Sequence, residues 1–274
     1  MLSTANDERT DRQQREIEYH REHAKAYKDI LERPFSWDVL ENPEKRWWNA
    51  YWQMYAYLVK CDLMNKRVLV VGCGFGEDAL RLAKLGAQVS AFDLSPDSLK
   101  IARELAAREG LNIDFEEMPA EALLYEDSVF DYVVARDILH HVDIPRAVSE
   151  IVRVAKPNGM FVVNEIYSHS VTERVRRSWY VEKVLYPRMK RKIYGDGKPY
   201  ITEDERKLNE VDLKWITKPL HSRDLDKHFN FLVTRIISDK SEFASKIDRA
   251  SLVLLKPVAQ FLAGRVLFAA RISK

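Results

Sequence analysis

The spacing of apolar side chains indicates three zones: a helical start, a middle in which strands and helices alternate, and an irregular end. In residues 5–32 apolar positions recur at spacings of three, four and seven within a polar background, which predicts an amphipathic helix that ends before Pro34. A second predicted helix opens at Pro43. Six aromatic residues fall within positions 43–60, so this helix either packs on a core or forms an aromatic wall over a ligand pocket.

From Lys66 onward, short apolar runs rich in β-branched residues alternate with helix-like stretches. Strands are predicted at residues 67–71, 88–92, 112–116, 132–135 and 160–164. Strands and helices in alternation are typical of a parallel sheet that helices cover on both faces. The sequence therefore predicts an α/β fold with a doubly wound, mostly parallel seven-stranded sheet, whose last two strands follow the irregular zone.

The alternation stops after Glu165, and the excursion of about 65 residues that follows is too long for a plain crossover. We therefore expect a helical insertion that covers the C-terminal edge of the sheet. A strand, a helix and a last strand are predicted after it, at residues 231–238, 247–263 and 265–272. The predicted segments are an N-terminal helical cap, the sheet core, a helical substrate lid and the last strands, at residues 1–62, 63–168, 169–230 and 231–274.

Composition narrows the class of protein. The 274 residues are 46% hydrophobic and 31% charged, which excludes a disordered chain. Cys61 and Cys73 are too few for a disulfide framework or a four-thiolate zinc site, so we expect a reducing, cytoplasmic setting. The start lacks an apolar core and no run of 18 apolar residues occurs, so neither a secretory signal nor a membrane span is expected. The net charge of +2 gives no strong attraction to nucleic acid.

The most informative segment is a glycine-rich turn between the first predicted strand and a helix. Gly72, Gly74 and Gly76 let the backbone turn sharply and let a ligand approach without Cβ clashes. Asp93 ends the second predicted strand, where a carboxylate can accept both hydroxyls of a ribose. A dinucleotide fingerprint needs a small residue at position 77, but the chain has Glu77, which suits a ligand with an ammonium or sulfonium group.

This segment resembles the class I S-adenosylmethionine-dependent methyltransferases, which have a Rossmann-like fold, and the resemblance continues downstream. Residues 130–134 look like the family's fourth strand, residues 135–142 resemble its "LHH" segment, and residues 146–160 match its helix, Lys-Pro-Gly-Gly-like turn and fifth strand. The resemblance covers roughly residues 66–166, together with the final strands. It implies that S-adenosyl-L-methionine is the cofactor and that residues 63–168 bind it.

The resemblance also implies the cofactor contacts. By position they are Gly72, Gly74 and Gly76 at the methionyl and ribose part, Asp93 at the ribose hydroxyls, Leu94 and Ala120 at the adenine, and Arg136 at the methionyl end. Two positions depart from the family's pattern: Val70 replaces an acid before the first glycine, and Pro119 replaces an aspartate of the adenine loop. Glu121 or a backbone amide is expected to serve the adenine instead.

Four side chains are candidate catalytic groups. His140 and His141 can act as a general base, or they can simply pack at a helix start beside the cofactor. Glu165 follows the fifth predicted strand at the ligand-binding edge, where it can face the substrate, and His169 lies four residues further on. These side chains and Asp137 could converge on a metal ion, but no tight ligand spacing is present, so no metal site is predicted.

Charge is unevenly distributed along the chain. Residues 171–200 hold nine Lys or Arg and three Asp or Glu, with aromatic residues between them. This pattern is typical of a solvated helical face, of a cap that reads an anionic substrate or a lipid headgroup at a membrane surface, or of a surface for single-stranded nucleic acid. The sequence indicates no oligomeric state.

The function that the sequence favours is methyl transfer from S-adenosylmethionine to the oxygen or carbon of a small-molecule or lipid-precursor acceptor, expected to be anionic. The alternatives are nucleic-acid methylation, a catalytically silent nucleoside-binding module and a NAD-type oxidoreductase. Glu77 disfavours the oxidoreductase, and residues 135–138 lack the Asn-Pro-Pro-Tyr motif of amino-methylating DNA enzymes.

Overall fold

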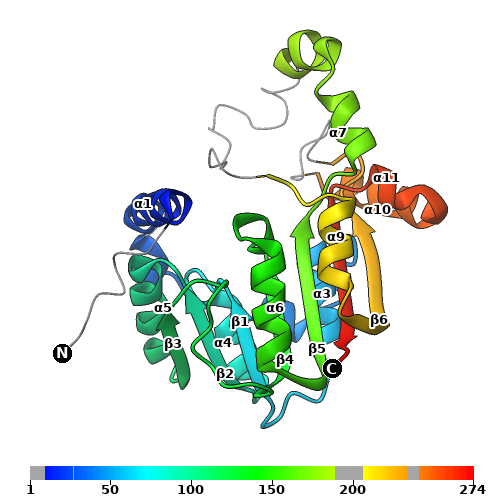
Figure 1. Ribbon diagram of the computed structural model, residues 1–274. Helices are drawn as coiled ribbons and strands as arrows, with labels where there is room; N and C mark the ends of the chain where they lie inside the picture. Colours follow the sequence, from blue (N-terminus) through cyan, green and yellow to red (C-terminus); the bar gives the residue numbers. More distant parts are fainter. Residues whose placement is uncertain (1–9, 27, 189–205, 234–240) are drawn as a thin grey trace.

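A computed structural model of the chain describes residues 10–26, 28–188, 206–233 and 241–274. Its centre is a seven-stranded sheet with the strand order β3-β2-β1-β4-β5-β7-β6 (Figure 1). The strands are β1 (Arg67–Val71), β2 (Gln88–Asp93), β3 (Ile113–Glu117), β4 (Phe130–Arg136), β5 (Ala155–Ile166), β6 (Leu220–Phe229) and β7 (Arg265–Ile272). Neighbouring strands are parallel except where β7 pairs with β5 and β6. The predicted doubly wound, mostly parallel seven-stranded sheet is confirmed.

Alternate side chains of each strand enter opposite apolar layers, one on each face of the sheet. In β1, Val68 and Val70 join one layer, whereas Leu69 and Val71 join the other. The helices of the first layer are α3 (Ala50–Leu58), α4 (Glu77–Lys84) and α5 (Pro96–Arg108), and those of the second are α6 (Ile144–Val154) and α9 (Glu210–Thr217). Because both faces are covered, the ligand-binding positions lie at the edge where the parallel strands end.

Caps fix where the helices beside that edge begin. Ser95 Oγ accepts a hydrogen bond from the Ser98 N–H at 3.2 Å, and Pro96 supplies a first residue whose missing N–H costs nothing. At the start of α6, the Asp143 carboxylate accepts from the Arg146 N–H at 3.1 Å. Shorter helical turns are η1 (Lys28–Leu31), α2 (Asp38–Glu41), η2 (Leu139–His141), η3 (Val181–Leu185), η4 (Lys256–Val258) and α11 (Ala259–Leu262).

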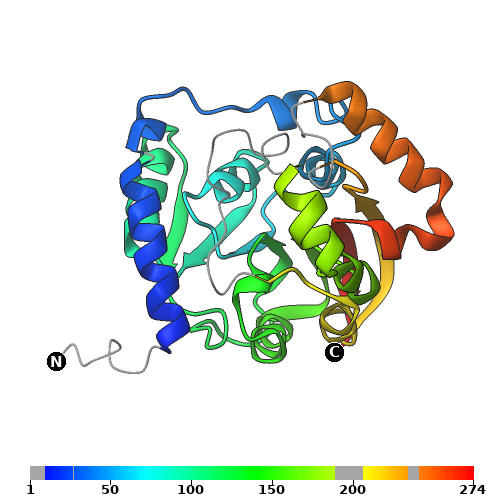
Figure 2. The same ribbon diagram turned by 90° about the horizontal axis from the view of Figure 1, so that it is seen from above.

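The predicted N-terminal cap at residues 1–62 divides into two parts with different positions. Helix α1 (Asp11–Ala26) lies beside α5, above the ends of the parallel strands (Figures 1 and 2). Helix α3 instead belongs to the core, because Tyr55 and Leu58 are fully buried. Among the described residues that line the cavity discussed below, none comes from α3. The aromatic-rich stretch therefore packs on the core, which was the first of its two predicted alternatives.

The sixth strand lies elsewhere than the sequence predicted. The sixth strand of the sheet is β6 at Leu220–Phe229, which corrects the prediction of this strand at residues 231–238; of that range, residues 234–238 lie outside the described residues. Strand β6 is the outermost strand, and its charged side chains protect that edge from pairing with other chains. The apolar stretch after it turns toward α10, where the Asp248 carboxylate accepts from the Phe231 N–H at 2.7 Å.

The remaining C-terminal elements follow the predicted order. Helix α10 (Glu242–Leu254) ends shortly before Pro257, which divides the single predicted helix at residues 247–263. Strand β7 has the predicted bounds. Of the predicted lid, α7 (Ser170–Arg176) rises above β5, and residues 189–205 lie outside the described residues (Figure 1). Within the described ranges, no helix is long and apolar enough to cross a membrane.

Candidate functional site

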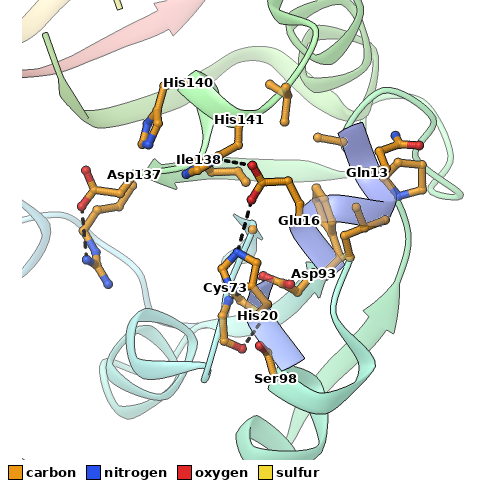
Figure 3. A pocket seen from close by; sticks show the side chains of 18 of the residues that line it. Gln13, Glu16, His20, Cys73, Asp93, Ser98, Asp137, Ile138, His140 and His141 are labelled. Atoms are coloured by element: carbon orange, nitrogen blue, oxygen red, sulfur yellow. Dashed lines mark hydrogen bonds and ion pairs between the residues drawn. The ribbon is translucent and has the colours of Figure 1, made fainter. Parts of the chain in front are cut away.

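A cavity of about 600 Å³ opens at the C-terminal ends of the parallel strands, beneath α1. Its walls come from the segments that follow β1 to β4 and from one face of α1 (Figure 3). It brings together most of the residues that the sequence singled out. Those that line it are Gly72, Gly74, Asp93, Leu94, Ala120, Arg136, His140 and His141.

Gly72, Gly74 and Gly76 all have positive φ, but they have different surroundings and different roles. A Cβ atom at Gly72 would come within 3 Å of the Ile138 side chain, so this glycine allows the segment after β4 to pack against the turn. A Cβ atom at Gly74 would meet nothing within 4 Å, which places this residue at open space in the cavity. A Cβ atom at Gly76 would lie 2.9 Å from Ala102 Cβ. Gly76 therefore serves the packing of α5 and does not line the cavity.

Asp93 ends β2 with its carboxylate held by two backbone donors. Its Oδ2 accepts from the Gly74 N–H at 2.8 Å and its Oδ1 from the Ser95 N–H at 2.9 Å. Each carboxylate oxygen has a second acceptor direction, so the group retains capacity for the two hydroxyls of a ribose. The buried Ser98 Oγ, which also lines the cavity, makes no hydrogen bond within the described part of the chain. These polar groups and the open space at Gly74 fit a nucleoside (Figure 3).

One end of the cavity is apolar. Leu94, Met118 and Ala120 line it together, and such a slot suits the faces of a purine. Glu121 also lines this end, but its Oε1 already accepts from the Asp143 N–H at 2.8 Å, which fixes the start of α6.

Arg136 leaves β4 inside a cluster of acids. Its Nε donates to Asp78 Oδ2 at 2.6 Å, and its guanidinium lies 3.9 Å from Glu77 and 3.5 Å from Asp137. Asp137 in turn lies 2.8 Å from Arg265 Nη1. Although burial opposes its charge, the neighbouring Arg265 and Arg136 guanidiniums hold the pKa of the Asp137 carboxyl below its usual range. The end of the cavity around Arg136 therefore holds several carboxylates, which suit an ammonium group.

The structure corrects the expectation that Glu165 faces the substrate. Glu165 is fully buried, and its Oε1 accepts from the N–H groups of Ile138 and Leu139, both at 2.7 Å. Its Oε2 lies 2.7 Å from His140 Nδ1. Strand β5 places this carboxylate below the histidine segment, where two backbone N–H groups and the His140 imidazole lie against it, so Glu165 does not line the cavity itself.

His169 lies apart from the other candidates. It caps α7, where its Nδ1 accepts from the Val171 N–H at 3.2 Å, and its ring packs 4.5 Å from that of Phe261. It does not line the cavity, so the structure does not bring it together with His140 and His141. Across the described ranges, no three His, Cys, Asp or Glu side chains form a group that could hold a metal ion.

The sequence predicts an N-terminal helical cap, but it did not identify the residues of α1 that line the cavity. Gln13, Glu16, His20 and His23 line the cavity from this helix. Glu16 Oε1 lies 3.1 Å from His141 Nδ1, and the His23 ring stacks on Phe75 at 5.2 Å. The only local signal is an amphipathic helix, and a helical period does not tell which residues face a cavity built by segments that are distant in the chain.

The comparisons with known proteins agree with the geometry. Residues 69–163 match the family described as "Methyltransferase domain". The ubiquinone biosynthesis O-methyltransferase of Methylocella silvestris is 40% identical over 99 residues, which is 36% of this chain and 39% of that protein. The protein of the same name from Xanthomonas oryzae is 36% identical over 109 residues, 39% of this chain and 46% of that protein. The matches thus span less than half the length of these curated relatives.

Solved structures share the fold. The magnesium protoporphyrin IX methyltransferase of Synechocystis, solved with bound SAH, superposes with a TM-score of 0.57 at 13% identity, over 96% of this chain and all (100%) of that one. Phosphoethanolamine N-methyltransferase 2 of Haemonchus contortus gives a TM-score of 0.53 at 20% identity, over 81% of this chain and 52% of that one. At these identities the likeness concerns the fold alone.

Proposed function

This chain carries a class I S-adenosylmethionine-dependent methyltransferase domain, and we propose that it transfers a methyl group from S-adenosylmethionine to a hydroxyl of a small-molecule or lipid-precursor acceptor. The observation that carries the proposal is the cavity at Gly74 and Asp93, which offers open space, a diol-binding carboxylate and an apolar slot in the order of a nucleoside. The relatives named for O-methylation support oxygen as the accepting atom.

In this proposal Asp93 binds the ribose hydroxyls, Leu94 and Ala120 flank the adenine, and the acids around Arg136 hold the methionyl ammonium. Bound S-adenosylmethionine supplies an already activated methyl group. The chain's own residues then have to align the acceptor oxygen, exclude water and accept a proton.

We assign the proton acceptor to the adjacent imidazoles of His140 and His141, with Glu165 as the positioning residue of His140. A fully buried carboxylate 2.7 Å from Nδ1 keeps the hydrogen on that nitrogen and orients the His140 ring beside that of His141. Two backbone N–H groups fix Glu165 itself, so the pair is rigid before any acceptor enters. Glu165→Gln should lower turnover about a hundredfold, with cofactor affinity retained.

The charge of the cavity favours an uncharged acceptor over the anionic one that the sequence suggested. The charged side chains among the described lining residues are Glu16, Glu77, Asp93, Glu121, Asp137, Arg136 and Arg265. Carboxylates therefore outnumber guanidiniums, and both arginines already lie against Asp137. A negative lining attracts a sulfonium cofactor and repels an acceptor carboxylate or phosphate.

The predicted contact with a lipid surface fits the face of α7 and η3. Val175, Trp179 and Tyr180 are more than half exposed there, beside Arg174 and Arg177. Exposed Trp and Tyr with basic side chains are the pattern of a membrane interface with anionic lipids. We propose that this face docks on an anionic bilayer from which a lipid-precursor acceptor is drawn.

Calorimetry and a turnover assay test the proposal together. S-adenosylmethionine and S-adenosylhomocysteine should bind and NAD should not. A panel of phenols, each paired with its carboxylated analogue, should then yield S-adenosylhomocysteine more efficiently with the uncharged member of each pair. Tight NAD binding without a response to S-adenosylmethionine would overturn the proposed function, whereas a preference for the carboxylates would overturn only the acceptor charge.

A further inference from the structure

Helix α1 supplies the carboxylate of a second carboxylate–imidazole pair at the cavity. Glu16 Oε1 lies 3.1 Å from His141 Nδ1, although the residues are 125 positions apart in the chain. The Glu16 side chain is 8% exposed and that of His141 is 15% exposed, so the pair is largely withdrawn from water. A hydrogen bond to a carboxylate in such surroundings is stronger than one at the surface.

This pair stands beside the one formed by Glu165 and His140. The two imidazole centroids are 4.1 Å apart, and both rings line the cavity (Figure 3). In each pair a buried carboxylate lies within hydrogen-bond distance of Nδ1, and at His141 this assigns Nε2 to a ligand. The site therefore presents two neighbouring imidazoles, tilted by 42°, one supported from β5 and one supported from α1.

We propose that Glu16 is a positioning residue of the acceptor site: it holds His141 with the hydrogen on Nδ1, so that Nε2 accepts a hydrogen bond from the acceptor hydroxyl. Because Glu16 belongs to α1, His141 takes this form only when α1 lies over the cavity. Covering the site and completing its acceptor-binding end are thus one event. The inference rests on the proposed function, because it presumes a hydroxyl acceptor.

The contacts of α1 place Glu16 over His141 specifically. Arg12, one turn before Glu16, donates through Nη2 to the His140 carbonyl oxygen at 3.0 Å. His20, one turn after it, brings Nε2 to 3.8 Å from the other oxygen of Glu16. Ile17 is buried beside them, so the apolar face of the helix fixes its rotation. A carboxylate so constrained supports one orientation of the imidazole.

The test measures which nitrogen of His141 carries the hydrogen, by ¹⁵N NMR of imidazole-labelled full-length protein saturated with S-adenosylhomocysteine. The wild type should show the Nδ1–H form. Glu16→Ala should shift His141 toward the Nε2–H form, whereas Glu16→Gln, whose amide oxygen still accepts, should keep it. Glu22→Ala is the matched control, because Glu22 lies on the exposed face of α1 beside Lys25. Wild-type His141 in the Nε2–H form, or no change in Glu16→Ala, overturns the proposal.

Phenol serves as the hydroxyl probe, with anisole as the matched compound that lacks the donor. Phenol should shift the His141 Nε2 resonance in the wild type and in Glu16→Gln, and at least about tenfold more phenol should be needed in Glu16→Ala, the size expected for one charge-assisted hydrogen bond. Equal responses to phenol and anisole, or no response to either, overturn the proposal. Binding of S-adenosylhomocysteine in calorimetry is judged separately, so a failure of the proposed function is distinguishable.

Discussion

The two walls of the cavity support the same kind of chemistry in different ways. On the sheet wall, Asp93 and Glu165 sit at strand ends and accept from backbone N–H groups whose positions the strands fix. On the α1 wall, Glu16 is held by side chains of distant segments, and an ion pair between Arg21 and Asp97 is partly exposed. Exposed ion pairs contribute little to stability, whereas buried hydrogen bonds to backbone groups contribute much more.

The two walls therefore have different roles in the site. The sheet wall is preformed, because backbone N–H groups at the strand ends hold its carboxylates in place. The α1 wall depends on how the helix docks, because its side chains reach the cavity only from that position. A methyltransferase needs both properties: a fixed cofactor seat, and a cover that admits the acceptor and then excludes water.

The largest effect should come from removing the carboxylate on which the sheet wall depends. Glu165→Ala leaves the N–H groups of Ile138 and Leu139 without their acceptor in a buried setting, so the free energy of unfolding should fall by about 3–5 kcal/mol. Urea denaturation measures this loss. Glu116→Ala, on the exposed side of β3, is the control and should change stability by less than about 0.5 kcal/mol. A loss below 1 kcal/mol in Glu165→Ala would contradict the preformed wall.

The next effect concerns cofactor affinity. Asp93→Ala removes the carboxylate proposed to accept the ribose hydroxyls, and affinity for S-adenosylhomocysteine in calorimetry should fall about 10- to 100-fold. Asp114→Ala on the exposed face of β3 should leave it unchanged. If Asp93→Ala binds S-adenosylhomocysteine as tightly as the wild type does, Asp93 does not bind the ribose.

The glycine turn separates packing from binding. Gly72→Ala places a Cβ atom against Ile138 at positive φ and should cost about 2–3 kcal/mol of stability. Gly74→Ala meets open space, so its cost should be only the backbone strain of about 1 kcal/mol, while cofactor affinity falls. Parallel denaturation and calorimetry of the two variants would show the contrast. Equal stability losses in both would contradict it.

A smaller effect is expected at the exposed face of α7 and η3. Replacing Arg174 and Arg177 by Ala should weaken binding to phosphatidylglycerol vesicles by about fivefold per residue, since each basic side chain near an anionic surface contributes about 1 kcal/mol. Trp179→Ala should weaken it further, because this side chain is 72% exposed. Sedimentation with vesicles measures both, with phosphatidylcholine vesicles as the control. Binding that ignores lipid charge would refute the proposed surface.

The smallest effect is a pH dependence of α1 docking. Burial, followed by the nearby His20, lowers the pKa of His23 below its ordinary value, so the docked helix prefers neutral His23. This contribution is present above the ordinary histidine pKa of about 6.5 and is lost as the pH falls below it. After correction for the intrinsic base-catalysed exchange rate, the protection factors of α1 amides should therefore be lower at about pH 5.5 than at about pH 7.5. His23→Phe, which keeps an aromatic stack on Phe75, should reduce this difference.

The sequence by itself determined the sheet core and the glycine turn that meets Asp93 at its edge. The alternation of apolar strands and helices, the glycine turn and Asp93 are local patterns whose spatial consequence is fixed by the chain's right-handed, parallel winding. The last strand was predicted with its observed bounds for the same reason, because its apolar run is continuous and buried. In these segments the local pattern of apolar residues and glycines is enough to predict where the segment lies in the fold.

Only the tertiary structure decided the acceptor side. It placed β6 in the polar residues 220–229, because an edge strand needs pairing with β7 on one side only. It turned Glu165 away from the cavity, because the N–H groups of Ile138 and Leu139 require a buried acceptor. It also brought Glu16 to His141. These outcomes depend on which distant segments come into contact. The helical and strand periodicities of the sequence do not contain that information.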